Sequence, residues 1–389
     1  MTRTVTGRAC VTIASGFLLG VLLSACGGGG GGSDDDGIDL DALKTEITVT
    51  REACTPFGAP PRPLQASNAL FQPTCITGGE RMADWTDAEG TTRTACLYEP
   101  EQASTEAPLP LVVYLHPSIF GPDISLAFNN VRGGLETADL SGDPERPGFI
   151  MLAPYGRVTE RYYPFPDDGL TPGWDNWYRQ LLPDRASRSV NGEAWPINVD
   201  VAAIDHFVDE VVASGKVDTA RIYLMGWSNG SAMAVLYALN RPEIAAAAVY
   251  SSPDPFEAFN DPCVQLPVPD APKDDTELQV FNAGLPIFHI HNDCDLAGLC
   301  PNGLYLKQTV LGTGVADFSN QIINTALNPV DACVDACGTD PLADYASLSE
   351  IPGYLGNLPA YTVGLANHLR WPIGYTDSMY AFLRDHPKN

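Results

Sequence analysis

The residues best suited to covalent chemistry lie in Gly226–Gly230, which reads Gly-Trp-Ser-Asn-Gly between an apolar stretch and a helix-forming stretch. A serine flanked in this way by two glycines is typical of a tight strand-to-helix turn that lifts the hydroxyl above the edge of a sheet. We expect a Cβ at either glycine to clash with this strained backbone. The sequence therefore predicts that Ser228 is a nucleophile, with the free N–H groups of the helix N-terminus facing the developing oxyanion.

A serine hydroxyl is a weak nucleophile, so Ser228 needs a base, and the base needs an acid that orients it. In one recurrent arrangement the acid and then the histidine follow the serine along the chain. Asp293 and Asp295 come directly after the apolar run 285–291, and His368 lies in the loop after the last predicted strand. Among the six histidines, His368 alone has the required order and location. Both carboxylates remain candidates for the acid, because either could instead cap its own turn.

Buried strands that alternate with helices must position these residues. The expected strands are 109–115, 149–153, the run leading into Ser228, 245–250, 285–291 and 361–365, and the expected helices are 199–212, the one that follows Ser228 and ends near residue 240, and 376–385. This alternation predicts an α/β fold with a mostly parallel, doubly wound sheet. Residues 296–357 are too long for a plain connection and are interpreted as an inserted cap or lid.

Three motifs give the chain a family resemblance. The serine turn extends to Met233 as G-x-S-x-G-S-x-M, His291–Asp295 ends in an acid, and His368–Pro372 reads His-Leu-Arg-Trp-Pro. Together they resemble the extracellular polyhydroxybutyrate depolymerase and feruloyl esterase group of the α/β-hydrolases, although the last motif has one extra residue between His and Trp. The resemblance implies an α/β-hydrolase fold, a carboxylic ester as small-molecule or polymeric substrate, no metal or organic cofactor, and Asp295 as the acid, with Asp293 as the alternative.

The expected oxyanion hole departs from the family pattern. Its early motif is His116-Pro117-Ser118, with proline where the family has glycine. Proline has no N–H to donate. The resemblance therefore implies that the backbone N–H groups of Asn229 and Ser118 bind the oxyanion.

Aromatic residues near these motifs are candidates for substrate contact. Gly173–Tyr178 resembles the W-N-W segment that the family places near its substrate, which implies substrate-binding roles for Trp174 and Trp177. Trp227 and His116 are included in the same predicted set. The structural alternative is that Trp174 and Trp177 anchor their loop to the core and that Trp227 packs under the serine turn.

The N-terminus has the features of an export signal. Two arginines and a short apolar run precede Leu23-Ser24-Ala25-Cys26, which resembles a bacterial lipoprotein signal. We expect residues 1–25 to be the signal peptide, 26–40 a flexible Gly/Asp tether, and 41–389 the catalytic domain. Lipidated Cys26 would then anchor the exported protein to a bacterial membrane, and we expect this to be the outer membrane or the cell surface. Release of the protein from that membrane is an alternative. A plain secretory signal is the alternative.

Cysteine content and charge limit the setting further. Apart from Cys10 in the signal and Cys26, eight of the ten cysteines remain, an even number that implies disulfides in an exported chain. Eight cysteines allow 105 pairings, and the sequence does not choose among them; Cys294–Cys300 and Cys333–Cys337 are plausible local pairs. The formal net charge of −26 argues against nucleic acid as a partner.

Two other functions share some of these features. A serine peptidase resembling the prolyl oligopeptidases would use the same three residues, but no propeller repeats precede the catalytic region. A surface protein that keeps the fold only for binding would not need an intact serine, acid and histidine. The sequence therefore favours an exported serine esterase over both alternatives.

Overall fold

The structure is a computed structural model that describes residues 74–87, 92–118, 120–158, 172–174, 188–190, 193–195, 199–252, 282, 284–292, 295, 318–323 and 366–388. All of them belong to one compact unit, Thr45–Asn389. The other unit, Met1–Lys44, lies outside the described residues, and so do the predicted signal, Cys26 and the tether. Trp177, Asp293 and the predicted strand 361–365 also lie outside them.

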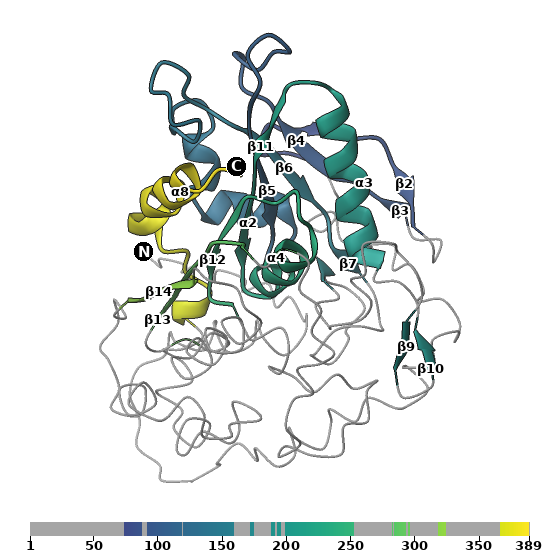
Figure 1. Ribbon diagram of the computed structural model, residues 1–389. Coiled ribbons are helices and arrows are strands. Elements are labelled where there is room, and N and C mark those ends of the chain that lie inside the picture. Colours follow the sequence, from purple (N-terminus) through teal and green to yellow (C-terminus); the bar gives the residue numbers. More distant parts are fainter. Residues whose placement is uncertain are drawn as a thin grey trace, which may run out of the picture. The chain divides into compact units, whose positions relative to one another are not determined.

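An eight-stranded sheet forms the centre of the described unit (Figure 1). Its strands lie in the order β1 (Glu80–Arg81), β4 (Ala95–Tyr98), β6 (Ile150–Pro154), β5 (Leu109–Leu115), β11 (Val217–Trp227), β12 (Ala246–Tyr250), β13 (Ile287–Asn292) and β14 (Phe318–Ile323). β4 pairs antiparallel with β1 and β6, whereas every neighbouring pair from β6 to β14 is parallel. The predicted α/β fold with a mostly parallel sheet is confirmed.

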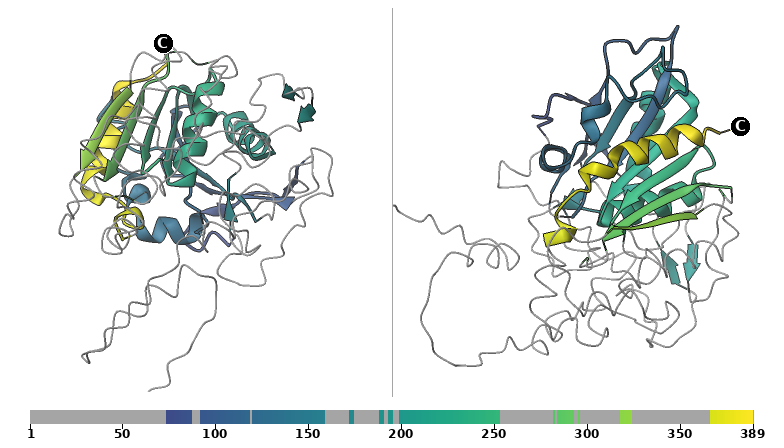
Figure 2. Two further views of the ribbon diagram at one scale, coloured as in Figure 1. Left: turned by 90° about the horizontal axis from the view of Figure 1, so that it is seen from below. Right: turned by 90° about the vertical axis from the view of Figure 1, so that its left-hand side faces the viewer.

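Helices cover both faces of this sheet (Figure 2). α3 (Val199–Ala213) and α4 (Asn229–Asn240) pack on one face, and α2 (Pro122–Phe128) and α8 (Thr376–Asp385) pack on the other. β5 illustrates why its sequence is continuously apolar. Leu111 and Val113 join the core beneath α3 and α4, while Val112 and Tyr114 join the core beneath α2 and α8. A strand buried on both faces therefore shows no alternation of polar and apolar residues.

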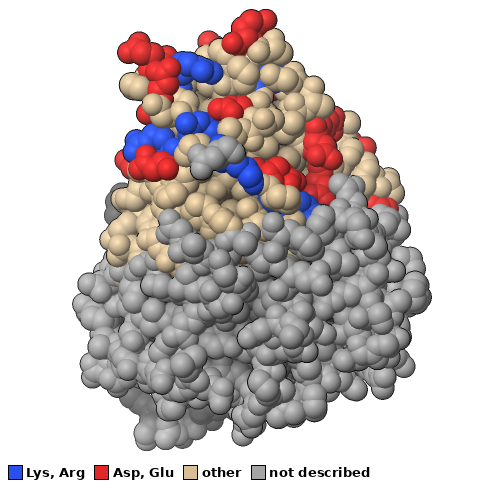
Figure 3. All heavy atoms as spheres, in the orientation of Figure 1, with Lys and Arg blue, Asp and Glu red and all other residues tan. Residues whose placement is uncertain are grey.

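Short paired strands and 3-10 turns complete the described elements. The two-stranded pairs are β2 (Trp85–Thr86) with β3 (Thr92–Arg93), β7 (Arg157–Val158) with β8 (Pro172–Gly173), and β9 (Arg188–Val190) with β10 (Glu193–Trp195). The 3-10 turns are η3 (Val131–Gly134) and η6 (Ile373–Tyr375). Among the described helices, none has the length and apolar character needed to cross a bilayer. Acidic and basic side chains are interspersed on the described part of the face in Figure 3.

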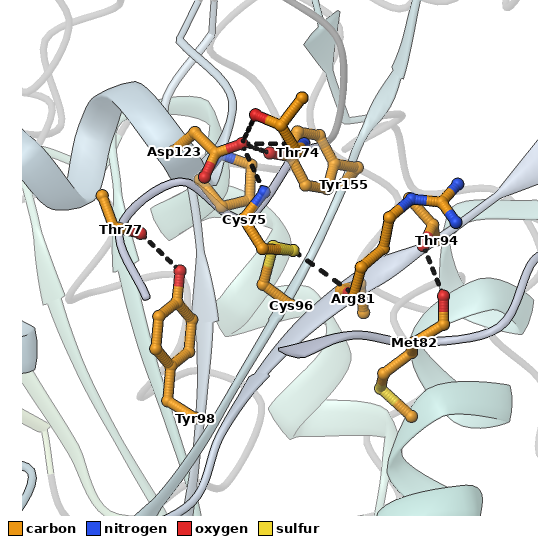
Figure 4. Close-up of a disulfide and its surroundings, with 12 residues drawn as sticks. Thr74, Cys75, Thr77, Arg81, Met82, Thr94, Cys96, Tyr98, Asp123 and Tyr155 are labelled. Atoms are coloured by element: carbon orange, nitrogen blue, oxygen red, sulfur yellow. Dashed lines mark hydrogen bonds between the residues drawn. A yellow bond between two sulfur atoms is a disulfide. The ribbon is translucent and has the colours of Figure 1, made fainter. Parts of the chain in front are cut away.

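A disulfide between Cys75 and Cys96 ties the start of the described chain to β4 (Figure 4). The buried carboxylate of Asp123, in the first turn of α2, accepts hydrogen bonds from the backbone N–H groups of Thr74 (3.0 Å) and Cys75 (2.9 Å). The Tyr155 hydroxyl donates to the same carboxylate oxygen. These contacts fix the N-terminus of α2, and α2 begins just after the segment Leu115–Ser118 that carries the predicted oxyanion donor.

One strand falls where the sequence predicted an insertion. Phe318–Ile323 forms β14, which pairs in parallel with β13 over all six residues, so these residues belong to the sheet and not to a cap. β14 ends the order of the sheet, and its Ser-Asn-Gln centre has no apolar run. An edge strand has a strand neighbour on one side only, and its sequence is correspondingly less apolar. The other residues of 296–357 lie outside the described part of the chain.

Candidate active site

Ser228 lies in the turn between β11 and α4, in a conformation that few non-glycine residues adopt. Its backbone has φ 57° and ψ −125°. A Cβ on Gly226 would lie 2.6 Å from the Gly230 carbonyl oxygen, and a Cβ on Gly230 would lie 2.2 Å from the Leu115 carbonyl oxygen. Both distances are far below van der Waals contact, so the expected clash at the two glycines is confirmed. The Ser228 N–H donates to the Tyr250 carbonyl over 3.0 Å, which fixes the turn to β12.

A continuous hydrogen-bonded chain joins Ser228, His368 and Asp295. The Ser228 hydroxyl lies 2.7 Å from His368 Nε2, and His368 Nδ1 lies 2.8 Å from Asp295 Oδ1. An ionised carboxylate only accepts hydrogen bonds, so Nδ1 carries the proton and Nε2 is free to accept the serine proton. All three side chains are buried. The arrangement has the composition, order and contacts of a serine–histidine–acid triad.

The loop that carries His368 is held on both sides of the histidine. The Tyr250 hydroxyl donates to the Asn367 carbonyl over 2.8 Å, and Trp227 Nε1 donates to the His368 carbonyl over 2.9 Å. Burial, and next the charge of Asp295, raises the pKa of Tyr250 well above its ordinary value, so its phenol keeps the proton that it donates. Trp371 packs edge-on against both the Trp227 and the Tyr250 rings.

Trp227 is therefore misassigned in the predicted substrate-binding set. Trp227 is 2% exposed, and the indole N–H, the one polar group of its side chain, donates a hydrogen bond to the His368 carbonyl. It packs beneath the turn and positions the histidine loop, as the structural alternative proposed. Neither Tyr250 nor Trp371 was predicted to take part. The sequence held one signal for Tyr250, because the predicted strand 245–250 comes between the strand of the serine and the strand of the acid along the chain. In the sheet, β12 also lies between those two strands.

Ser251, the residue after β12, was also missed. Its hydroxyl lies 2.7 Å from Asp295 Oδ2 and 2.7 Å from His368 Nδ1. It is fully buried, and its backbone φ of 56° makes it one of three non-glycine residues with positive φ in the described part of the chain. Its own hydroxyl proton goes to the acceptor-only carboxylate, so its oxygen accepts from His368.

The predicted oxyanion donors lie at the same edge of the sheet. Asn229 is the first residue of α4, where backbone N–H groups have no partner within the helix. Its side chain is already committed: Oδ1 accepts from the Trp174 N–H over 2.7 Å, and Nδ2 donates to the Trp174 carbonyl over 3.2 Å. Ser118 is half-buried and follows β5, the neighbour of β11 in the sheet.

His116 and Trp174 are buried and do not present side chains to a substrate, contrary to the predicted set. His116 is 0% exposed, its Nε2 accepts from the Gly156 N–H over 2.8 Å, and its Nδ1–H donates to the Pro117 carbonyl over 2.7 Å. Trp174 is 1% exposed and donates from Nε1 to the His116 carbonyl over 2.9 Å. Both residues hold the segment after β5 in place. Aromatic rings with a polar atom suit such buried anchoring as well as they suit a binding cleft.

Burial lowers the pKa of His116 from 6.5 to about 4, and this predicts a loss of stability in acid. Above pH 6.5 the imidazole is neutral in both states. Between pH 6.5 and pH 4 the unfolded chain binds a proton that the folded protein excludes, so the free energy of unfolding falls by roughly 3 kcal/mol, and below pH 4 this group costs nothing more. Urea unfolding of the wild type and of His116→Gln at pH 7 and pH 4 measures this effect.

The His116→Gln variant is expected to be less stable at pH 7 but to lose less stability between the two pH values. Other carboxylates titrate in the same range in both proteins, so the difference between the two slopes isolates the histidine. Equal slopes would show that His116 is protonated as easily in the folded state as in the unfolded one.

The strand order and the positions of these residues define an α/β-hydrolase fold. Counted along the chain, Ser228 follows the fifth strand of the central sheet, Asp295 the seventh and His368 the eighth. The turn with its two required glycines at the end of β11 is the nucleophile elbow of that fold.

Comparisons with known proteins give structural likeness alone. No family model matches the sequence, and no curated protein matches it. A thermostable esterase is 18% identical, with a TM-score of 0.40, and the match covers 74% of this chain and 62% of that one. An acylaminoacyl peptidase from Pyrococcus horikoshii is 11% identical (TM-score 0.43, 80% and 42% covered), and the Bacillus cereus carboxylesterase is 13% identical (TM-score 0.37, 63% and 91% covered).

Proposed function

We propose that the protein is an exported serine hydrolase that cleaves carboxylic esters through an acyl-enzyme on Ser228. The observation that carries this proposal is the hydrogen-bonded chain from Ser228 Oγ to His368 Nε2 (2.7 Å) and from His368 Nδ1 to Asp295 Oδ1 (2.8 Å), at a strained nucleophile elbow. A serine of this kind requires a base within hydrogen-bond reach and an acid that orients the base.

In the proposed mechanism Ser228 Oγ attacks the ester carbonyl while His368 Nε2 takes its proton. Asp295 keeps the imidazole in the Nδ1–H form and stabilises the imidazolium. The backbone N–H groups of Asn229 and Ser118 bind the oxyanion of the tetrahedral intermediate. When the intermediate collapses, the ester C–O bond breaks and His368 gives its proton to the leaving alcohol. Water then attacks the acyl-enzyme by the same route and releases the acid.

The proposed substrates are polyhydroxyalkanoate, feruloyl or acetyl esters. The support comes from the motifs Gly226–Met233, His291–Asp295 and His368–Pro372, which resemble those of polyhydroxybutyrate depolymerases and feruloyl esterases. A peptidase of the prolyl-oligopeptidase type is the second candidate, because the same triad attacks amide carbonyls, and a non-catalytic surface protein is the third.

Export is part of the proposal. The Cys75–Cys96 disulfide supports it, because disulfides persist in oxidising compartments outside the cytoplasm. The lipoprotein-like segment Leu23–Cys26 supports an anchor at Cys26, with the glycine-rich residues that follow acting as a tether.

A fluorophosphonate probe tests the class, and a substrate panel tests the specificity. The expected results are an adduct on Ser228, mapped by peptide mass spectrometry, and hydrolysis within a panel of short p-nitrophenyl esters, hydroxybutyrate oligomers, methyl ferulate and acetylated xylan. Faster turnover of acylated peptides than of any ester would favour the peptidase. A protein that neither reacts with the probe nor hydrolyses any panel member would be the binding protein instead.

A further inference from the structure

The end of β12 contacts every member of the proposed triad. The Tyr250 carbonyl accepts from the Ser228 N–H, and the Tyr250 hydroxyl holds the residue before His368. The Ser251 hydroxyl then reaches both other members, at 2.7 Å from Asp295 Oδ2 and 2.7 Å from His368 Nδ1. Ser251 therefore forms hydrogen bonds with both the acid and the base of the proposed triad.

The backbone of Ser251 has a strained, positive-φ conformation at the point where its side chain makes these contacts. Its N–H still continues the sheet by donating to the Ile290 carbonyl over 2.8 Å, but its φ of 56° turns the chain away from the strand. Non-glycine residues held at positive φ cost free energy, and they cluster at functional sites where surrounding contacts maintain them. A glycine would adopt this conformation more easily, but it would lack the hydroxyl.

We infer that Ser251 is a positioning residue for the proposed triad: its hydroxyl fixes the carboxylate of Asp295 and the imidazole of His368 in their reactive orientation. This inference rests on the proposed function. Asp295 is completely buried, so its second oxygen needs a donor from the protein, and the Ser251 hydroxyl supplies one. With Oδ2 held by Ser251, Oδ1 stays directed at His368 Nδ1.

The same hydroxyl oxygen also acts on the histidine during turnover. When His368 takes the Ser228 proton, positive charge appears on the ring, and the Nδ1–H bond to Ser251 Oγ and Asp295 Oδ1 strengthens. Hydrogen bonds to charged groups contribute more than bonds between neutral groups. The contribution of Ser251 is therefore larger in the transition state than with substrate bound, and its loss is expected to lower kcat and to leave KM nearly unchanged.

The test compares Ser251→Ala and Ser251→Gly with the wild type. Both variants lack the hydroxyl, but the glycine relieves the backbone strain and the alanine keeps it. Active sites are first titrated with the fluorophosphonate probe, so that kcat is expressed per reactive serine. We expect kcat for p-nitrophenyl butyrate to fall about 10- to 100-fold in both variants, as the loss of a hydrogen bond to a charged group predicts. KM is expected to change less than about threefold.

Ser125→Ala is the matched control. Ser125 is also fully buried, and its hydroxyl donates to the Pro122 carbonyl within its own helix. Its removal is expected to leave kcat at the wild-type value. The proton resonance of His368 Nδ1–H gives an independent readout: we expect it to lie far downfield in the wild type and in Ser125→Ala, and to move upfield in both Ser251 variants.

Two results would overturn the inference. Wild-type kcat in Ser251→Ala would show that the hydroxyl does not position the triad, and wild-type kcat in Ser251→Gly alone would assign the effect to the backbone. Failure of the proposed function gives a different pattern, because Ser228→Ala would then keep its activity whatever Ser251 does.

Discussion

Ser228→Ala is expected to lose nearly all ester hydrolysis, with kcat reduced by a factor on the order of 10⁶. The alanine removes the only atom that forms the acyl-enzyme bond, and what remains is the weaker help that the oxyanion donors give to attack by water. Alanine keeps the Cβ at this strained position, so the fold and thermal unfolding should match those of the wild type. Initial rates with p-nitrophenyl esters and circular dichroism measure the two effects.

The probe makes this result specific to the hydroxyl. Ser228→Ala should also fail to react with a fluorophosphonate, whereas Ser125→Ala should react like the wild type. If Ser228→Ala kept more than a tenth of the wild-type rate, the nucleophile would have to be another residue, and the proposed function would be wrong.

Asp295→Asn is expected to lower kcat by a factor on the order of 10⁴. The amide preserves the size of the side chain but can donate a hydrogen bond toward Nδ1, which favours the imidazole form whose Nε2 carries the proton. That form cannot accept the Ser228 proton. The substitution also removes the negative charge that stabilises the imidazolium. Steady-state kinetics at pH 8 measure the loss, with active sites counted by the probe.

Asp293→Asn is the matched control, two residues before Asp295 and after the same strand. Its kcat should stay within a few-fold of the wild type. The reverse result, a large loss at Asp293 and a small one at Asp295, would make Asp293 the triad acid and the Asp295–His368 contact a structural one.

Much of the fold was predictable because the sheet is buried on both faces. The seven residues Leu109–Leu115 and the helix Thr376–Asp385 were predicted with the bounds that the structure gives. β14 was not predicted, because an edge strand with a polar centre lacks the signal of a buried one. The pairing of Cys75 with Cys96 was also beyond prediction, since it depends on which strands lie side by side and not on spacing along the chain.

The site was predictable where chain order and chemistry coincide, as they do for Ser228 and His368. Reasoning from the residues alone left both Asp293 and Asp295 as candidates for the acid. The misassigned residues are His116, Trp174 and Trp227. Each side chain has an N–H group that can bind either a substrate or a backbone carbonyl, and the sequence does not reveal whether the side chain faces the substrate or the protein interior. Ser251 carries no motif, and its proposed role follows from its contacts with Asp295 and His368, which the sequence alone does not reveal.

The end-of-strand placement of these groups has a consequence for engineering. Ser228, Ser251 and Asp295 follow β11, β12 and β13, which are adjacent in the sheet. Hydrogen-bonded strands are spaced by about 4.8 Å, so backbone pairing sets the distances between these groups and the connections do not. We therefore expect that the chain between Ser252 and Asn282 can be exchanged or lengthened without moving Ser228, Ser251 or Asp295. Loop grafting at this connection is therefore the way to change the surroundings of the proposed triad while keeping the contacts among its members.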